Sequence, residues 1–167
     1  MKYKSLMICG LGQAGKDKFA EALEKLGMPF ESSSWVALDL HIWQHWGRYL
    51  YATKQECYAD RMNHRMKWKQ MITDMNAEDP TTLGRLIYAR CPVYVGCRSI
   101  REFMALKNAG HFDLSVWVSA EERKPDLVDE SCEIIKGMCD KEMTNDNTLC
   151  DLFLKAESFI DQFLITA

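Results

Sequence analysis

The chain has 167 residues, of which 47% are apolar and 27% charged, and its formal net charge is −3. Such a length and composition are typical of one globular domain that buries its core without disulfide or metal cross-links. The slightly acidic balance excludes a surface built as a whole to hold a long polyanion, but a local basic patch can still bind phosphate.

The sequence predicts a protein of the cytoplasm. No apolar run approaches the roughly 18 residues of a transmembrane helix, so we expect no membrane partner, and no signal peptide is recognisable. The seven cysteines form no C-x-x-C pair, and their odd number and irregular spacing argue against a disulfide framework. We therefore expect a reducing compartment, which is the host cytoplasm if the protein is encoded by a phage.

The N-terminal part alternates short apolar runs with helical patterns. Residues 3–9 (YKSLMIC) predict a buried strand, and residues 16–26 (KDKFAEALEKL) predict a helix that Gly27 ends in a left-handed conformation. Residues 28–32 (MPFES) indicate a second short strand. A Trp-rich helix is expected to follow from about residue 34 to residue 50.

Two further helices are predicted from their start signals. The sequence TKQE at 53–56 is a capping box, and it predicts a long helix that continues to about Asn76. The dipeptide Asp-Pro at 79–80 combines an N-cap residue with proline at the first helical position. It predicts another helix, which ends near Arg90.

The second half continues the alternation. Residues 92–97 (PVYVGC) and 112–118 (FDLSVWV) read as buried strands, and the Ser/Glu pair at 99–102 predicts a capped helix that ends near Gly110. The Ser/Glu pair at 119–122 repeats this capping pattern.

The last part of the chain begins with an irregular, charged segment. We expect a lid over about residues 119–140, a short strand at 141–145 (KEMTN) and an amphipathic helix from Thr148. Apolar strands alternating with helices predict an α/β fold with a parallel sheet of about five strands and helices on both faces. Residues 1–167 then form a single domain.

Ligands of such sheets bind at the carboxyl ends of the strands, where the chain offers the loops 10–16, 96–99 and 119 onward. The first loop has the pattern G-x-x-x-x-G-K between a predicted strand and a predicted helix. Its backbone N–H groups and the helix N-terminus can hold phosphates, and its lysine can reach the outer phosphates. A tight structural turn with a solvent-exposed lysine is the alternative. The candidate ATP-binding residues here are Gly10, Leu11, Gly12, Gln13, Ala14, Gly15, Lys16, Asp17 and Lys18, with Lys16 also catalytic.

Asp17 departs from the usual phosphate-loop pattern, which has Ser or Thr after the lysine. That hydroxyl normally contacts Mg²⁺, and a carboxylate is also a hard oxygen ligand, so Asp17 is the candidate metal ligand. An acidic residue in the first turn also favours the helix dipole without any metal. The sequence leaves both interpretations open.

A basic and aromatic stripe follows in the predicted long helix. Arg61, His64, Arg65, Trp68 and Ile72 share one face if this helix is continuous. Guanidinium groups can hold a phosphate and an indole can stack on a base, so we assign Arg61, His64, Arg65 and Trp68 to substrate binding. A solvated charged face with Trp68 partly buried is the alternative.

Other charged side chains lie near the predicted ligand-binding edge. Arg98 directly follows the strand at 92–97, so we expect it to stabilise charge on a transferring phosphoryl group and to touch the substrate. An ordinary arginine at the start of a helix is the alternative. Arg123 and Lys124 begin the predicted lid, where cations can close onto phosphates. Asp39 is a weaker candidate for substrate binding, since an ordinary solvated acid has the same pattern.

Four segments together resemble the bacteriophage deoxynucleoside monophosphate kinases, and they span most of the chain: GLGQAGKDKFAEAL, YVGCRSIREFMALKNAG, LSVWVSAEERKP and EMTNDNTLCDLF. The resemblance implies a three-layer P-loop NTPase fold, the donor ATP, Mg²⁺ and a deoxynucleotide acceptor. Gly-Lys-Asp is common in that family, so Asp17 becomes a family trait. The family often has Asp-x-Arg where this chain has Gly96-Cys97-Arg98, which leaves open the source of the acid.

The resemblance also implies where the nucleotides bind. It puts the purine of ATP near 145–148, with Asn145 and Asn147 as candidate ligands, and the acceptor in a helical region at about 34–90. The first hypothesis is therefore a deoxynucleoside monophosphate kinase acting on small nucleotides. The alternatives are a kinase for a hydroxymethyl pyrimidine in DNA, which the net charge disfavours, and a nucleotide-binding protein without catalysis. A homodimer is possible, because exposed Trp and Met can serve core or interface.

Overall fold

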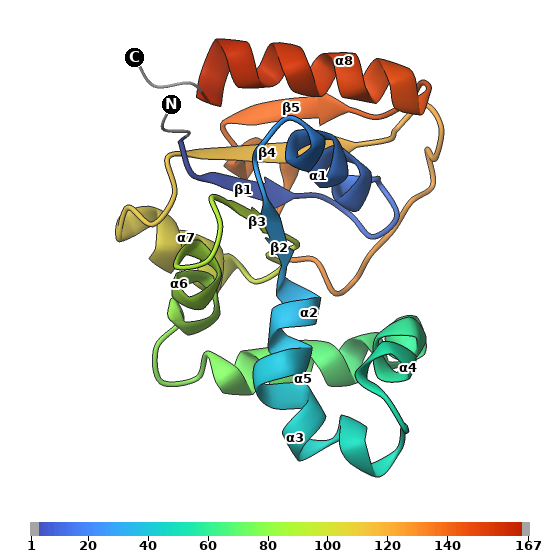
Figure 1. The fold of residues 1–167 in the computed structure, drawn as a ribbon, viewed down its shortest axis with the longest axis vertical. Helices are drawn as coiled ribbons and strands as arrows, with labels where there is room; N and C mark the ends of the chain where they lie inside the picture. The colour runs from blue at the N-terminus through green and yellow to red at the C-terminus, as the bar shows by residue number, and fades with distance from the viewer. Residues whose placement is uncertain (1–3, 165–167) are drawn as a thin grey trace.

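The computed structural model describes residues 4–164, and its centre is a parallel five-stranded sheet in the order β2-β3-β1-β4-β5 (Figure 1). This confirms the predicted fold class and the position of each predicted strand. The strands are β1 (Leu6–Cys9), β2 (Phe30–Ser32), β3 (Val93–Val95), β4 (Leu114–Ser119) and β5 (Lys141–Thr144).

Helices cover both faces of the sheet, as continuous apolar strands require. On one face, Leu6 and Ile8 of β1 share a core with α1 (Lys16–Lys25) and α8 (Leu149–Phe159), which continues as a π-helical turn at Ile160–Leu164. On the other face, Met7 and Cys9 share a core with α6 (Thr82–Tyr88) and α7 (Ile100–Asn108). The alternation along β1 thus divides the core into two layers.

A helical region extends away from the sheet (Figure 1). It contains α2 (Ser33–Ala37), a π-helical turn (Leu38–Ile42), α3 (Trp43–His45) and a 3₁₀ turn (Gly47–Tyr49). A second run contains α4 (Lys54–Ala59), a 3₁₀ turn (Asp60–His64) and α5 (Arg65–Met75).

The helix predicted at 34–50 is present from Ser33 but ends at His45 and contains a π-helical turn, whereas the continuous helix predicted at 53–76 is wrong. Trp46 leaves the helical conformation, with φ −148°, and its ring packs against Tyr51 and His64. Asp60 accepts hydrogen bonds from the Tyr51 hydroxyl at 2.7 Å and from Asn63, and it also bonds His64. Such local side-chain bonds compete with a regular helix, and they break the second run between Ala59 and Arg65.

The predicted caps have mixed outcomes. The capping box at Thr53 is present, and the Ser99 hydroxyl accepts from the Glu102 N–H as predicted. The helix predicted from Thr148 is also present, with the Thr148 hydroxyl as its cap. No helix follows Ser119, because its hydroxyl donates to Glu142 and the Glu122 N–H donates to Asp146 instead. The helix predicted from Asp79 begins only at Thr82, since the Asp79 carboxylate holds the N–H and hydroxyl of Thr81 in a preceding turn.

The structure also bears on the cysteines and on the prediction of no membrane-spanning helix. All seven cysteines are free thiols. Within residues 4–164, no helix has the length and apolar character needed to cross a membrane.

Candidate phosphate-binding site

The three predicted loops meet at one edge of the sheet. Strand β1 lies between β3 and β4, and all three are parallel, so their carboxyl ends bring together loop 10–15, residues 96–99 and the segment after Ser119. The place predicted for ligand binding is thus the place where these chain segments converge.

Loop 10–15 has a constrained backbone. Gly10, Gln13 and Gly15 have positive φ angles of 144°, 66° and 97°. A Cβ on Gly15 would lie 1.9 Å from the Asn145 amide nitrogen, which donates to the Ala14 carbonyl at 3.0 Å. Asn145 is therefore a buried support of the loop, and only glycine fits at Gly15.

Lys16 is folded back over the loop and is not solvent-exposed, which contradicts the exposed lysine expected for a purely structural turn. Its Nζ donates to the carbonyls of Gly10 at 2.8 Å and Leu11 at 2.6 Å, and the residue is only 8% exposed. Burial, and then the nearby Arg98 guanidinium, lower the pKa of Lys16 to about 8. The lysine is thus a desolvated cation at the mouth of the loop.

A carboxylate from the predicted lid lies inside this site. The Gly12 N–H donates to Asp129 Oδ2 at 2.7 Å, and Arg98 donates to the same oxygen. Arg65 pairs with Asp129 Oδ1 at 3.2 Å, and the Ser131 hydroxyl and N–H donate to that oxygen as well. Both carboxylate oxygens are therefore held by several donors from four parts of the chain.

The Asp129 side chain is 1% exposed and remains ionised in this position. Burial alone would raise the pKa of Asp129, but the hydrogen bonds from Ser131 and Arg98 outweigh it and hold the pKa well below its usual range. Space is equally tight, because a Cβ on Gly12 would lie 2.8 Å from Asp129 Oδ2 and 2.9 Å from the Arg65 guanidinium.

The structure also shows which acid lies beside Arg98, a question that the sequence leaves open. Gly96 has a φ of 96°, and a Cβ there would lie 3.0 Å from the Ser33 hydroxyl, which donates to the Gly96 carbonyl. An aspartate at this position would be strained. The carboxylate beside Arg98 comes instead from Asp129, on a different part of the chain.

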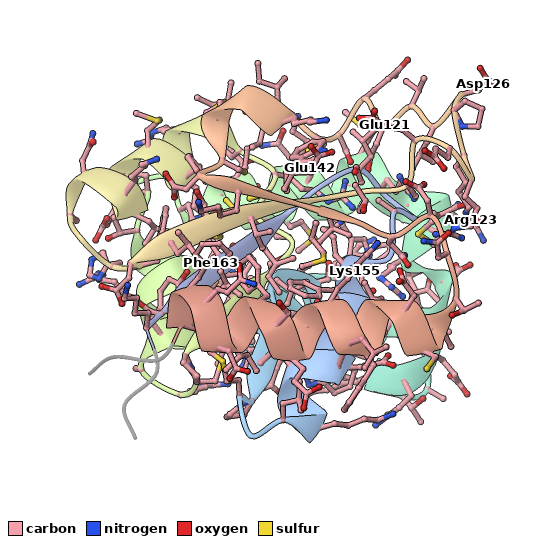
Figure 2. The ribbon with its side chains drawn as sticks, turned by 90° about the horizontal axis from the view of Figure 1, so that it is seen from above. Glu121, Arg123, Asp126, Glu142, Lys155 and Phe163 are labelled. Carbon is pink, nitrogen blue, oxygen red and sulfur yellow. The ribbon has the colours of Figure 1, made fainter. Side chains whose placement is uncertain are left out.

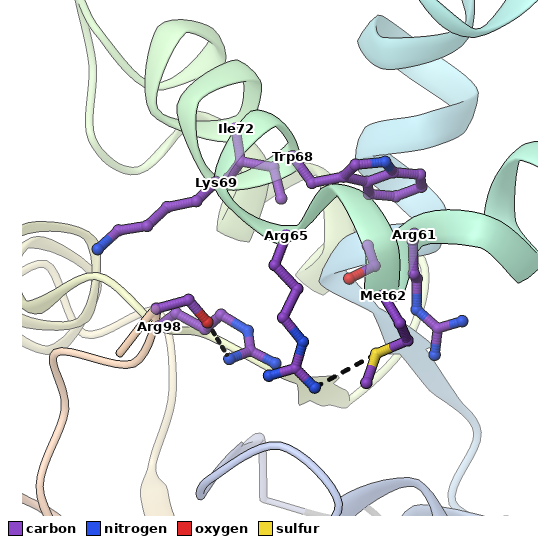
Figure 3. Close-up of a pocket in the computed structure, with 9 residues that line it drawn as sticks. Arg61, Met62, Arg65, Trp68, Lys69, Ile72 and Arg98 are labelled. Carbon is purple, nitrogen blue, oxygen red and sulfur yellow. Dashed lines mark hydrogen bonds between the residues drawn. The ribbon is translucent and has the colours of Figure 1, made fainter. Parts of the chain in front are cut away.

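A small cavity adjoins the anion site on the side of α5 (Figure 3). It has a volume of about 60 Å³ and continues toward a second cavity of about 40 Å³ between α5 and β3. The guanidinium groups of Arg65 and Arg98 lie beside one another at its floor (Figure 3). Its lining includes Ser34, Arg61, Arg65, Trp68, Lys69 and Arg98.

The predicted substrate-binding residues are only partly brought together. Arg61 lines the cavity and stacks on the Tyr58 ring at 4.0 Å, while Trp68 is 4% exposed and forms a wall without an open stacking face. His64 bonds Asp60, and Asp39 pairs with Lys54 at 2.6 Å. Neither His64 nor Asp39 lines this cavity: His64 belongs to the 3₁₀ turn before α5, and Asp39 belongs to the π-helical turn after α2.

The remaining predicted residues lie around the start of α1 and α8. Asp17 and Lys18 are exposed, and Lys18 pairs with Glu21 at 2.8 Å. Asn147 is exposed and donates to Asp151 at 3.4 Å. Among residues 4–164, no group of three or more His, Cys, Asp and Glu side chains forms a ready metal site. The Asp17 carboxylate nevertheless suits a hard cation that arrives with a polyphosphate.

The segment between Ser119 and β5 crosses the loop and carries Asp129. Lys124 donates to the Gln13 side chain at 3.1 Å, and Arg123 donates to the Asn145 carbonyl at 3.2 Å. Figure 2 shows Arg123 and Asp126 on this segment at the outer end of the molecule. A cavity of about 130 Å³ lies beneath it, lined in part by Leu11, Ala14, Trp117 and Lys124.

Sequence reasoning missed Asp129, Ser131 and Lys69. Asp129 and Gly12 are 117 residues apart, and no local pattern connects them. Lys69 had a usable signal, because it follows Arg65 by four residues and so shares its helix face. It pairs with Glu133 at 2.9 Å and ties α5 to the same segment.

Comparisons with known proteins add little to this geometry. No protein-family model matches the chain, and no curated protein does. Among solved structures, a gluconokinase from Sinorhizobium meliloti 1021 is similar, with 18% identity, a TM-score of 0.49, and coverage of 97% of this chain and 94% of that one. A similarity of this size carries no conclusion about activity.

Proposed function

We propose that this protein is an ATP-dependent kinase that phosphorylates a deoxynucleoside monophosphate to the diphosphate. One observation carries the proposal: a single buried anion is held at once by the phosphate-loop N–H of Gly12 and by the guanidinium groups of Arg65 and Arg98. Donors from a phosphate loop and from an adjoining basic cavity converge on one anion, as in-line transfer between two phosphates requires.

The residues suit phosphoryl transfer without a general base. An oxygen of the acceptor phosphate attacks the γ-phosphorus of ATP, the bond from that phosphorus to the β-phosphate oxygen breaks, and ADP leaves. A monophosphate is largely dianionic at neutral pH, so no proton has to be removed. Lys16 and Arg98 would stabilise the charge of the transferring group, and such electrostatic stabilisation is the main requirement of this chemistry.

Magnesium belongs to the proposal as the partner of the ATP phosphates. Asp17 would hold it, directly or through water, and the metal would neutralise charge on the phosphates. The purine of ATP is proposed to lie near 145–148, where Asn145 supports the phosphate loop and Asn147 is exposed. Mg²⁺-dependent binding of ATP that Asp17→Ala weakens would support the metal role.

The acceptor is proposed to enter the cavity beside α5. Arg61, Arg65 and Arg98 give this cavity a strongly cationic lining, which suits an acceptor that is itself an anion. Deoxynucleosides lack that charge and should be poor acceptors. Met62 and Ile72 line the cavity and supply apolar surface against which a base can pack.

The test is release of ADP from ATP with each deoxynucleoside monophosphate, and with the matching nucleosides as controls. Arg61→Ala should raise the KM for the acceptor about tenfold, the loss of one charged hydrogen bond, while the KM for ATP stays the same. Arg85→Ala, on an exposed arginine that pairs with Asp79, is the control for loss of a positive charge. No turnover with any monophosphate would refute the proposed acceptor class.

Two alternatives give different results in the same assays. Transfer of labelled phosphate to hydroxymethyl pyrimidine in DNA, and not to free nucleotides, would indicate a DNA-modifying kinase. Binding of ATP with no transfer to any acceptor would indicate a protein that only binds nucleotides.

A further inference from the structure

Asp129 occupies the space that the proposed activity needs for a phosphate. Its carboxylate uses the Gly12 N–H, Arg65 and Arg98, and these are the donors that a phosphate of a substrate would use. A backbone N–H donates one hydrogen, so it cannot serve the carboxylate and a phosphate oxygen equally well at the same time. The two anions therefore compete.

We propose that Asp129 is an internal anion that closes the phosphate site in the ligand-free protein and is expelled when a polyphosphate binds. The inference rests on the phosphate-binding part of the proposed function, but it does not depend on which acceptor is used. Asp129 would thereby act as an autoinhibitory contact that lowers the affinity for the donor nucleotide.

The charges explain why a polyphosphate can replace the carboxylate. Three cations, Lys16, Arg65 and Arg98, surround the single negative charge of Asp129. The positive charge of Arg98 repels that of Lys16, and this repulsion contributes to the lowered pKa of Lys16. A polyphosphate carries several negative charges and neutralises this cluster more fully than a carboxylate does.

The free volume leads to the same conclusion. The cavities beside α5 measure about 60 and 40 Å³, and the cavity beneath the segment measures about 130 Å³. Small-molecule sites usually offer about 300–1,000 Å³, so none of these cavities encloses a whole nucleotide. Displacement of Asp129 and its segment would enlarge them.

The part of the segment that carries Asp129 can move without the sheet. Between Ser119 and the 3₁₀ turn at Lys136–Met138 the segment contains no helix or strand. Polar contacts hold residues 120–133 over the site: Lys124 to Gln13, Glu133 to Lys69, and the Glu133 N–H to the Arg98 carbonyl at 2.8 Å. Ile134 is 1% exposed and packs in the core that contains Met7 and Cys9 of β1, so it would stay as the fixed end of this movement.

The size of the effect follows from competition. If only a fraction of the molecules has the site free, the apparent dissociation constant rises by the inverse of that fraction. Coupling between two sites of a protein usually changes the affinity for a ligand by about 5–150-fold. We expect removal of the Asp129 carboxylate to tighten polyphosphate binding by about tenfold or more.

The experiment is a calorimetric titration of the full chain with sodium tripolyphosphate at constant ionic strength. Asp129→Ala and Asp129→Asn should bind about tenfold tighter than the wild type, or more. Glu130→Gln is the matched control, because it removes the same charge from the exposed neighbouring residue. It should leave the affinity within about twofold. Equal or weaker binding by both Asp129 variants, or no binding by any protein, would overturn the proposal.

A measurement on the wild-type protein covers the case in which the variants fold poorly. The Ser131 N–H donates to Asp129 Oδ1 at 3.2 Å. Saturating tripolyphosphate should therefore speed hydrogen exchange at Ser131 and at Glu133, whose N–H bonds Arg98. Unchanged or slower exchange would overturn the proposal. Neither readout involves an acceptor, so failure of the kinase assay and failure of this test are distinguishable.

Discussion

Glu102 should make the stability of this protein depend on pH in a direction opposite to that of most carboxylates. The side chain is 3% exposed, and the Tyr94 hydroxyl donates to its Oε1 at 2.7 Å. Burial raises the pKa of Glu102 from 4.5 to about 7, although hydrogen bonds from Tyr94 and Asn76 oppose the rise. Folding therefore favours the protonated form of the Glu102 carboxyl group.

The magnitude follows from this shift. The pKa difference between 4.5 and about 7 corresponds to about 3 kcal/mol, at roughly 1.4 kcal/mol per pKa unit. Because the folded-state pKa is the higher one, the contribution is fully present below pH 4.5 and is lost as the pH rises through about 7. The free energy of unfolding should therefore fall by up to about 3 kcal/mol over this window.

Glu102→Gln isolates this effect, since glutamine keeps an acceptor for Tyr94 and does not titrate. Urea unfolding should give similar stabilities for variant and wild type at about pH 5, and a variant more stable by up to about 3 kcal/mol at about pH 8. Glu157→Gln, on an exposed residue of α8, controls for the change in formal charge. The reasoning is refuted if the difference between variant and wild type is the same at both pH values.

Three further predictions concern the phosphate site. Because the pKa of Lys16 is lowered to about 8 and a bound polyphosphate would raise it, binding above about pH 8 should take up a proton and weaken as the pH rises. Calorimetry in buffers of different ionisation heats measures the uptake, which Lys16→Met should abolish. Gly12→Ala should fold, because its Cβ meets only the movable ends of Asp129 and Arg65. It should lose polyphosphate binding, because the same Cβ would occupy the space in which a phosphate replaces the Asp129 carboxylate. Gly10→Ala should instead unfold the protein at lower urea, since its Cβ would lie 2.4 Å from the Val118 carbonyl oxygen and its φ is 144°; equal midpoints for the two variants would contradict this.

The parts of the fold that could be predicted from sequence are those with local causes. The strand before Gly10, the helix from Lys16 and the left-handed Gly27 follow from short patterns of apolar residues and glycines. Apolar continuity of the strands was enough to predict a parallel sheet with covered faces. The order of the strands had no local signal, and it is this order that puts the loop after β3 beside loop 10–15.

The basic stripe shows why a periodic pattern can mislead. Its residues share one face only if the helix is unbroken, but the hydrogen bonds of Asp60 with Tyr51 and His64 replace the helix between Ala59 and Arg65. The face that survives belongs to α5 alone, where Arg65 and Lys69 point toward the segment that carries Asp129. A tertiary contact, the Tyr51 hydroxyl on Asp60, thus decides which predicted ligands reach the site.

Asp129 marks the limit of sequence reasoning most clearly. In the sequence it is one acid in a charged, irregular segment, and its neighbour Glu130 has the same appearance while remaining exposed. What distinguishes Asp129 is the set of donors that the sheet edge offers, from Gly12, Arg65 and Arg98 together. Those donors come from segments that only the strand order makes neighbours. Under the proposed competition, the donors that now hold the Asp129 carboxylate are the ones that a polyphosphate would use to replace it.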